Sequence, residues 1–115
     1  MINTNKPTLH LILKKKWFGM ILSGEKTVEY REIKTYYGKL FACGQIKIGG
    51  IFYEADQVVI CFHLGCRKSN PIMLVACEGL SIGVGNPNLG AEPNVPYYRL
   101  DLGKILAVKN CEKLI

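Results

Sequence analysis

A run of alternating apolar residues near the middle of the chain constrains the fold most strongly. In residues 57–64 (QVVICFHL), Val58, Ile60, Phe62 and Leu64 would form one wholly apolar face of a strand. Further strand patterns occur at residues 8–14, 27–33, 71–78 and 97–102. One early helix among many short strands predicts a mostly β (α+β) fold, a small barrel that carries one main helix after the first strand.

The segments between these strands have weaker patterns. Residues 17–23 place apolar side chains on one helical stripe, and Gly24 stands where a glycine commonly ends a helix. We expect a helical turn at 36–41, a short strand and turn at 44–50, and a strand continuing through 105–109. Residues 82–96 are rich in Gly, Asn and Pro, and we expect them to form a long loop at the rim of a cleft.

The length and composition predict one domain spanning residues 1–115. The chain has neither a segment typical of a secretory signal nor an uncharged stretch apolar enough to span a bilayer. We therefore expect a cytoplasmic protein that does not bind membranes.

The five cysteines are odd in number, which together with the missing signal favours free thiols over disulfides. Cys61, His63 and Cys66 are close enough in sequence to suggest a metal site. No second cluster with zinc-site spacing follows, so we expect buried free thiols, with no metal or cofactor.

The formal net charge is +6, and its whole excess lies in the first half of the chain. Residues 1–50 contain nine Lys and Arg against three acids, whereas residues 51–115 contain six of each. A basic region of this kind favours an anionic partner, nucleic acid first, although it is also compatible with simple solubility.

Residues 24–33 (GEKTVEYREI) concentrate charge in a chain that is 49% hydrophobic. On a strand, Thr27, Glu29 and Arg31 share one face, and Lys26 lies at the start of the strand. If that face is exposed, the ion pair contributes little. If the face lines a cleft, the charges must pair with one another, which is costly without a function.

Lys14, Lys15 and Lys16 lie at the expected start of the helix, where cations oppose the helix dipole. Free backbone N–H groups at a helix start also attract anions. The three lysines are therefore either solvated residues tolerated at small cost or part of a phosphate site.

Two stretches resemble the ASCH domain family, whose fold is similar to the PUA RNA-binding barrel. Residues 9–34 (LHLILKKKWFGMILSGEKTVEYREIK) contain the G-x-K-x-x-E-x-R pattern of that family, matched by Gly24, Lys26, Glu29 and Arg31. Residues 80–106 (LSIGVGNPNLGAEPNVPYYRLDLGKIL) resemble a small single-domain branch. Together the two stretches cover about half of the chain.

The resemblance implies a PUA-like barrel with a cleft beside the first helix, in which RNA or a modified nucleoside binds. Lys26, Glu29 and Arg31 would form the floor of this cleft. The predicted ligand-binding residues are Lys14, Lys15, Lys16, Trp17, Lys26, Thr27, Glu29 and Arg31.

Two alternatives remain open. The first is a hydrolase, either a ribonuclease or an enzyme similar to the branch that hydrolyses N4-acetylcytidine, with Lys26 and Glu29 as the catalytic pair. Lys26 matches the lysine of that branch, but Glu29 occupies the position of its nucleophilic threonine, and Thr27 lies two residues earlier. The second alternative is a partner-binding domain whose charges are purely structural.

Overall fold

The computed structural model describes residues 5–114, and these residues are mostly in β-strands. The strands are β1 (Thr8–Leu13), β2 (Val28–Glu32), β3 (Phe41–Ala42), β4 (Gln45–Ile48), β5 (Ile51–Glu54), β6 (Val59–Leu64), β7 (Ile72–Val84) and β8 (Pro96–Lys109). The helices are α1 (Lys15–Leu22) and α2 (Thr35–Gly38), with 3₁₀ turns η1 (Ala55–Gln57), η2 (Pro87–Leu89) and η3 (Glu112–Leu114). The mostly β prediction is confirmed.

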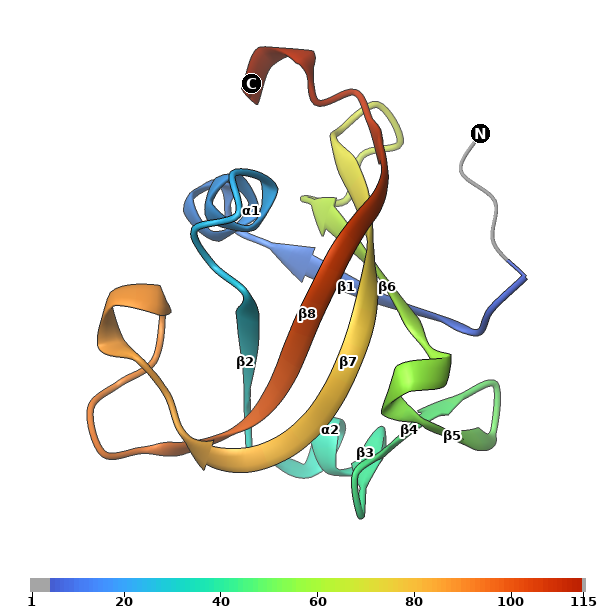
Figure 1. The fold of residues 1–115 in the computed structure, drawn as a ribbon, viewed down its shortest axis with the longest axis vertical. Helices are drawn as coiled ribbons and strands as arrows, with labels where there is room; N and C mark the ends of the chain where they lie inside the picture. Colours follow the sequence, from blue (N-terminus) through green and yellow to red (C-terminus); the bar gives the residue numbers. More distant parts are fainter. Residues whose placement is uncertain (1–4, 115) are drawn as a thin grey trace.

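Five strands form one sheet in the order β1-β6-β7-β8-β2, and β3, β4 and β5 form a second, small antiparallel sheet. The pairing of β1 with β6 is parallel, and the other pairs of the large sheet are antiparallel. Figure 1 shows β7 and β8 side by side as a long curved ribbon. Because β1 and β2 are edge strands, the described sheet is not closed into a barrel, and the PUA-like barrel stays a prediction.

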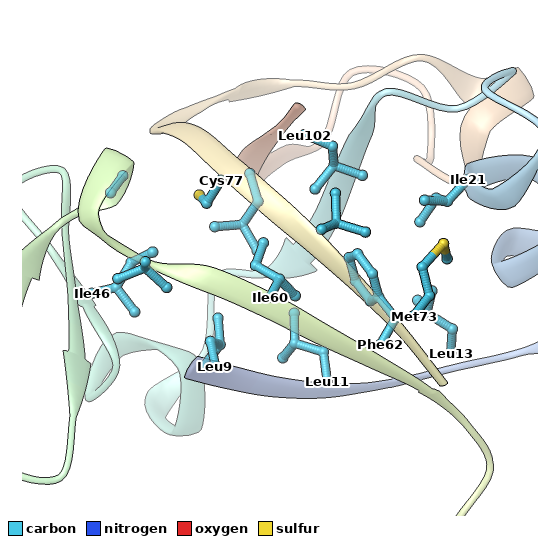
Figure 2. Close-up of a cluster of buried hydrophobic side chains, with 14 of the residues drawn as sticks. Leu9, Leu11, Leu13, Ile21, Ile46, Ile60, Phe62, Met73, Cys77 and Leu102 are labelled. Carbon is cyan, nitrogen blue, oxygen red and sulfur yellow. The ribbon is translucent and has the colours of Figure 1, made fainter. Parts of the chain in front are cut away.

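The hydrophobic core follows the alternation that the sequence displays. Leu9, Leu11 and Leu13 of β1 point to the same side as Ile60 and Phe62 of β6 (Figure 2). Helix α1 covers this face with Phe18 and Ile21, which are both buried. The opposite face of the sheet carries a second, smaller cluster of Val59, Cys61 and Leu74.

The long loop expected at 82–96 is shorter in the structure, because its ends belong to strands. Strand β7 continues to Val84 and β8 begins at Pro96, so that Gly83 pairs with Tyr97. A Cβ atom at position 83 would lie 2.7 Å from Cζ of Arg99. The glycine that suggested a loop instead leaves room for a side chain from the neighbouring strand.

Helix α1 begins at Lys15, two residues earlier than expected, and no side chain caps its start at Lys14. Its end agrees with the sequence prediction, since Gly24 has the positive φ of +85° that favours glycine after a helix. The turn expected at 36–41 divides into α2 and β3. Within residues 5–114, no helix is both long enough and apolar enough to cross a membrane.

All five cysteines are free thiols, as expected. Cys61, Cys77 and Cys111 are buried. The expectation of burial is wrong for Cys43 and Cys66, which are both exposed.

Candidate functional site

A cavity of about 940 Å³ opens where the end of β1 and the start of α1 meet β2 and the segment 85–95. Its lining combines aromatic rings with charged groups of both signs. The lining residues are Ile12, Leu13, Lys14, Trp17, Glu29, Tyr30, Arg31, Glu32, Ile33, Lys34, Tyr37, Gly90, Glu92, Val95, Pro96 and Tyr97. Three cations and three carboxylates line the cavity, so the lining itself is balanced in charge.

Two charged residues are buried among those described, Lys26 at 3% exposure and Glu29 at 4%. Nζ of Lys26 lies 3.2 Å from Oε1 of Glu29, and Nη2 of Arg31 lies 2.6 Å from Oε2. Nε of Arg31 donates a second hydrogen bond to the same Oε2, at 3.0 Å. The charges at 26, 29 and 31 therefore pair with one another, as a buried ionic group must.

Arg31 also fixes the neighbouring elements around the carboxylate. Its Nη1 donates to the Tyr37 hydroxyl at 3.0 Å, and its Nη2 donates to the backbone oxygen of Ile12 at 3.1 Å. Together with the two bonds to Glu29, these use four of the five N–H groups of the guanidinium. Arg31 thus joins β2 to β1 and to α2, and it holds Glu29 in one orientation.

Lys26 is not among the residues that line the cavity, although it contacts several that do. Its Nζ donates to the backbone oxygen of Leu89 and lies 4.7 Å from the ring centre of Trp17 and 5.1 Å from that of Tyr30. Burial lowers the pKa of Lys26, although the neighbouring Glu29 carboxylate acts in the opposite direction. Lys26 therefore connects the cavity floor to the segment 85–95.

The segment 85–95 is attached to β2 and β8 by backbone N–H groups that donate to two tyrosine hydroxyls. Asn86 donates to Tyr30 at 3.0 Å, and Glu92 donates to Tyr97 at 3.0 Å. Figure 1 shows this segment in orange, turning back beside β2. As expected from the sequence, this segment borders the cavity, through Gly90, Glu92 and Val95.

The structure separates the predicted ligand-binding residues into two groups. Lys14, Trp17, Glu29 and Arg31 line the cavity, and Lys26 is paired with Glu29. Outside the lining are Lys15, Lys16 and Thr27.

The three outlying residues have clear structural reasons for their positions. Lys15 and Lys16 are in the first turn of α1, which rotates them toward a second depression on the helix surface. Thr27 precedes β2 and is exposed, and its backbone oxygen accepts a hydrogen bond from the Leu102 N–H at 2.9 Å.

Several lining residues were missed by the sequence analysis. Tyr30 alternates with Glu29 along β2, yet both residues line the cavity. Tyr97 and Glu92 approach β2 only through the pairing of β2 with β8, which local sequence patterns do not reveal.

Comparison with protein-family models, curated proteins and solved structures finds no match to this chain. The resemblance to ASCH domains therefore stays a prediction, and the site must be interpreted from its own geometry.

Proposed function

We propose that this is an ASCH-type domain, related to the PUA barrel, that binds a base of RNA or of a modified nucleoside in the cavity. The observation that carries the proposal is the carboxylate of Glu29, which lines the cavity although its side chain is almost fully buried. A negative charge held at the floor of a cavity attracts ligand groups that donate hydrogen bonds.

The hydrogen bonds of Glu29 leave room for a ligand. An ionised carboxylate offers about four acceptor positions. Arg31 supplies two donors to Oε2 and Lys26 supplies one to Oε1, so acceptor capacity remains on Oε1. The amino groups and ring N–H groups of nucleobases are suitable donors, and carboxylates accept from the amino group of cytosine in this way.

The size and the lining of the cavity fit a nucleoside. Pockets for small ligands typically measure about 300–1,000 Å³, and this one measures about 940 Å³. Aromatic side chains at the walls, among them Trp17 and Tyr37, suit a flat aromatic ligand.

The balanced charge of the lining favours recognition of a base over purely electrostatic binding of phosphates. Lys14 is the lysine of the 14–16 group that lines the cavity, and in this proposal it contacts a phosphate attached to the nucleoside. A cytoplasmic location fits the five free thiols, because reducing compartments keep cysteines unpaired.

The first experiment is fluorescence anisotropy with a short labelled single-stranded RNA at several salt concentrations, together with calorimetric titration of free nucleosides. Glu29→Gln should weaken binding because an amide replaces the buried carboxylate. Glu32→Gln is the matched control, since Glu32 also lines the cavity but its side chain is 70% exposed. Absence of binding to RNA at low salt and to every nucleoside tested would refute the proposal.

Binding is proposed over the hydrolase or ribonuclease alternative because of the position of Lys26. Its ammonium group donates to the Leu89 oxygen and to Glu29 and lies outside the cavity lining. Incubation with RNA and with N4-acetylcytidine, followed by chromatography, tests this choice. Product formation that disappears in Lys26→Met would favour the enzyme instead.

A further inference from the structure

A second group of chemically reactive side chains lies on the outer face of the large sheet. Cys61 and His63 are two residues apart on β6, so they point to the same side. The parallel pairing of β1 with β6 places His10 directly opposite Cys61. Ligand atoms of these three residues all lie within 4.8 Å of one another.

None of the three residues lines the cavity described above. On β1, His10 alternates with Leu9 and Leu11, which face the main core, and Cys61 belongs to the smaller cluster on the opposite face. This second site is therefore separate from the proposed nucleoside site, and the two can be tested independently.

We propose that His10, Cys61 and His63 bind a transition-metal ion, with Zn²⁺ as the best match. Two imidazoles and one thiolate are a donor set that suits Zn²⁺, and they would leave a fourth position for water or another ligand. The burial of the three residues agrees with an ion held at the surface, since Cys61 is buried, His63 is half-buried and His10 is exposed.

The ligand atoms of the three residues, which lie within 4.8 Å of one another, must rearrange to share one ion. Nδ1 of His10 and Nε2 of His63 are 2.8 Å apart and share a hydrogen bond. Tetrahedral Zn²⁺ with bonds of about 2.0–2.1 Å to nitrogen would hold two such atoms about 3.3 Å apart. The exposed His10 ring is free of surrounding core packing, so its rotation can change both this separation and its distance to Cys61.

Metal binding would move two protons. One of the two facing nitrogens carries the hydrogen of their shared bond, and this hydrogen must shift to the other nitrogen of that ring. Burial raises the pKa of the Cys61 thiol, so the ion must displace its proton to solvent. No electron transfer is involved.

Cys66, which the sequence placed beside Cys61 and His63, does not belong to this group and lies on an exposed turn. It therefore provides a natural control, as does the exposed Cys43. Both are free thiols that would produce any nonspecific metal binding by cysteine.

The test is a titration of the reduced protein with Co²⁺, followed by displacement with Zn²⁺. Thiolate bound to Co²⁺ gives a charge-transfer absorption in the near ultraviolet, which reports directly on cysteine coordination. We expect this band in the wild type, in Cys66→Ser and in Cys43→Ser, and its loss in Cys61→Ser. His10→Ala and His63→Ala should each lower the affinity for Co²⁺ by more than about 100-fold. Loss of a group that only hydrogen-bonds to a metal ligand typically costs about 10- to 100-fold.

His10→Ala keeps the test valid even if replacement of the buried Cys61 unfolds the protein, because the His10 side chain is exposed. Circular dichroism of each variant checks the fold. The proposal is overturned if the wild type shows no band, if the band persists in Cys61→Ser, or if His10→Ala binds Co²⁺ as tightly as the wild type. In those cases His10 and His63 are a hydrogen-bonded pair without a metal.

Discussion

The ammonium group of Lys26 and the carboxylate of Glu29 lie 3.2 Å apart, and both side chains are almost completely removed from solvent. Such a pair recovers its desolvation cost only when its remaining hydrogen-bonding groups are also satisfied. The backbone oxygen of Leu89 accepts a second hydrogen bond from Lys26, and Arg31 donates to the other oxygen of Glu29. Among the described residues, no buried side-chain nitrogen or oxygen atom lacks a hydrogen-bond partner.

Removal of Glu29 should therefore destabilise the fold strongly. Glu29→Ala leaves Lys26 and Arg31 without their counter-charge, and breaking a buried pair in this way typically costs about 3–5 kcal/mol. We expect a clearly lower urea midpoint for Glu29→Ala. Glu32→Ala is the control, because Glu32 and Lys34 form an exposed pair at 3.6 Å whose loss should change stability by less than about 1 kcal/mol. Equal midpoints for the two variants would contradict a structural role for the buried network.

Lys26 should make stability depend on pH in the alkaline range. Its folded-state pKa is lowered by burial from 10.5, so between the folded pKa and 10.5 the unfolded chain binds more protons than the folded one. The contribution of Lys26 to stability therefore rises with pH in this window, and it falls again as pH drops through the folded pKa. Lys26→Met removes this titration while it retains the apolar stem.

The measurement is the free energy of unfolding of both proteins, from neutral pH up to 10.5. The difference between wild type and Lys26→Met isolates Lys26, because all other lysines are common to both. We expect the wild type to gain stability relative to the variant as pH rises. Parallel profiles would show that Lys26 has the same pKa in the folded and unfolded states.

Strands β1, β2 and β6 and the helix α1 could be predicted because their signals are local. The alternation in β1 and β6 and the glycine after α1 each depend on neighbouring residues. The far end of β7 and the start of β8 could not be predicted. Gly83 is needed there because the Arg99 side chain of the opposite strand occupies the space of a Cβ atom. The sequence alone does not distinguish a glycine in a loop from a glycine that makes room for a side chain of another strand.

The candidate site likewise combines features that follow from local sequence patterns with features that depend on contacts between distant residues. Glu29 and Arg31 share a face of a strand by simple periodicity, so their pairing could be anticipated. The burial of Lys26 could not, because the segment that covers it lies about sixty residues later in the chain. The approach of His10 to Cys61 likewise depends on a parallel pairing between distant strands.

The positions of Lys14 and Lys15 predict different effects on RNA binding. Lys14 lines the cavity, whereas Lys15 lines the second depression on α1. Loss of one phosphate contact should reduce the steepness of log affinity against log salt concentration by about 0.7 for a single strand. We expect this reduction in Lys14→Ala and little change in Lys15→Ala, although both substitutions remove one positive charge. An identical loss in both variants would mean that only the overall charge matters.

Two tyrosine hydroxyls should control the exchange of two specific amides. Tyr30→Phe removes the acceptor of the Asn86 N–H, and Tyr97→Phe removes that of the Glu92 N–H. We expect each amide to exchange with solvent roughly 2- to 13-fold faster in its own variant, equivalent to about 0.5–1.5 kcal/mol per hydrogen bond. Each variant serves as the control for the other. If both amides accelerate equally in either variant, the segment 85–95 opens as one unit.

Gly90 and Gly19 should respond in opposite ways to the same substitution. Gly90 has a φ of +105°, and a Cβ atom there would lie 3.2 Å from Cζ2 of Trp17 and 3.4 Å from Nζ of Lys26. Alanine at position 90 should therefore destabilise the protein by about 1–2 kcal/mol, since left-handed backbone disfavours residues with a Cβ. The substitution would also press on the wall of the proposed nucleoside site.

Gly19 lies within α1, and a Cβ atom there would meet nothing within 4 Å. Gly19→Ala should therefore stabilise the protein by about 0.5–1 kcal/mol, because glycine inside a helix costs that much relative to alanine. Thermal unfolding of both variants beside the wild type tests the pair. A lower melting temperature for Gly90→Ala and a higher one for Gly19→Ala would support the positions of the segment 85–95 over Trp17 and of the open face of α1. If Gly90→Ala were neutral, this segment would have to lie away from Trp17 and Lys26, and the cavity would lose one of its walls.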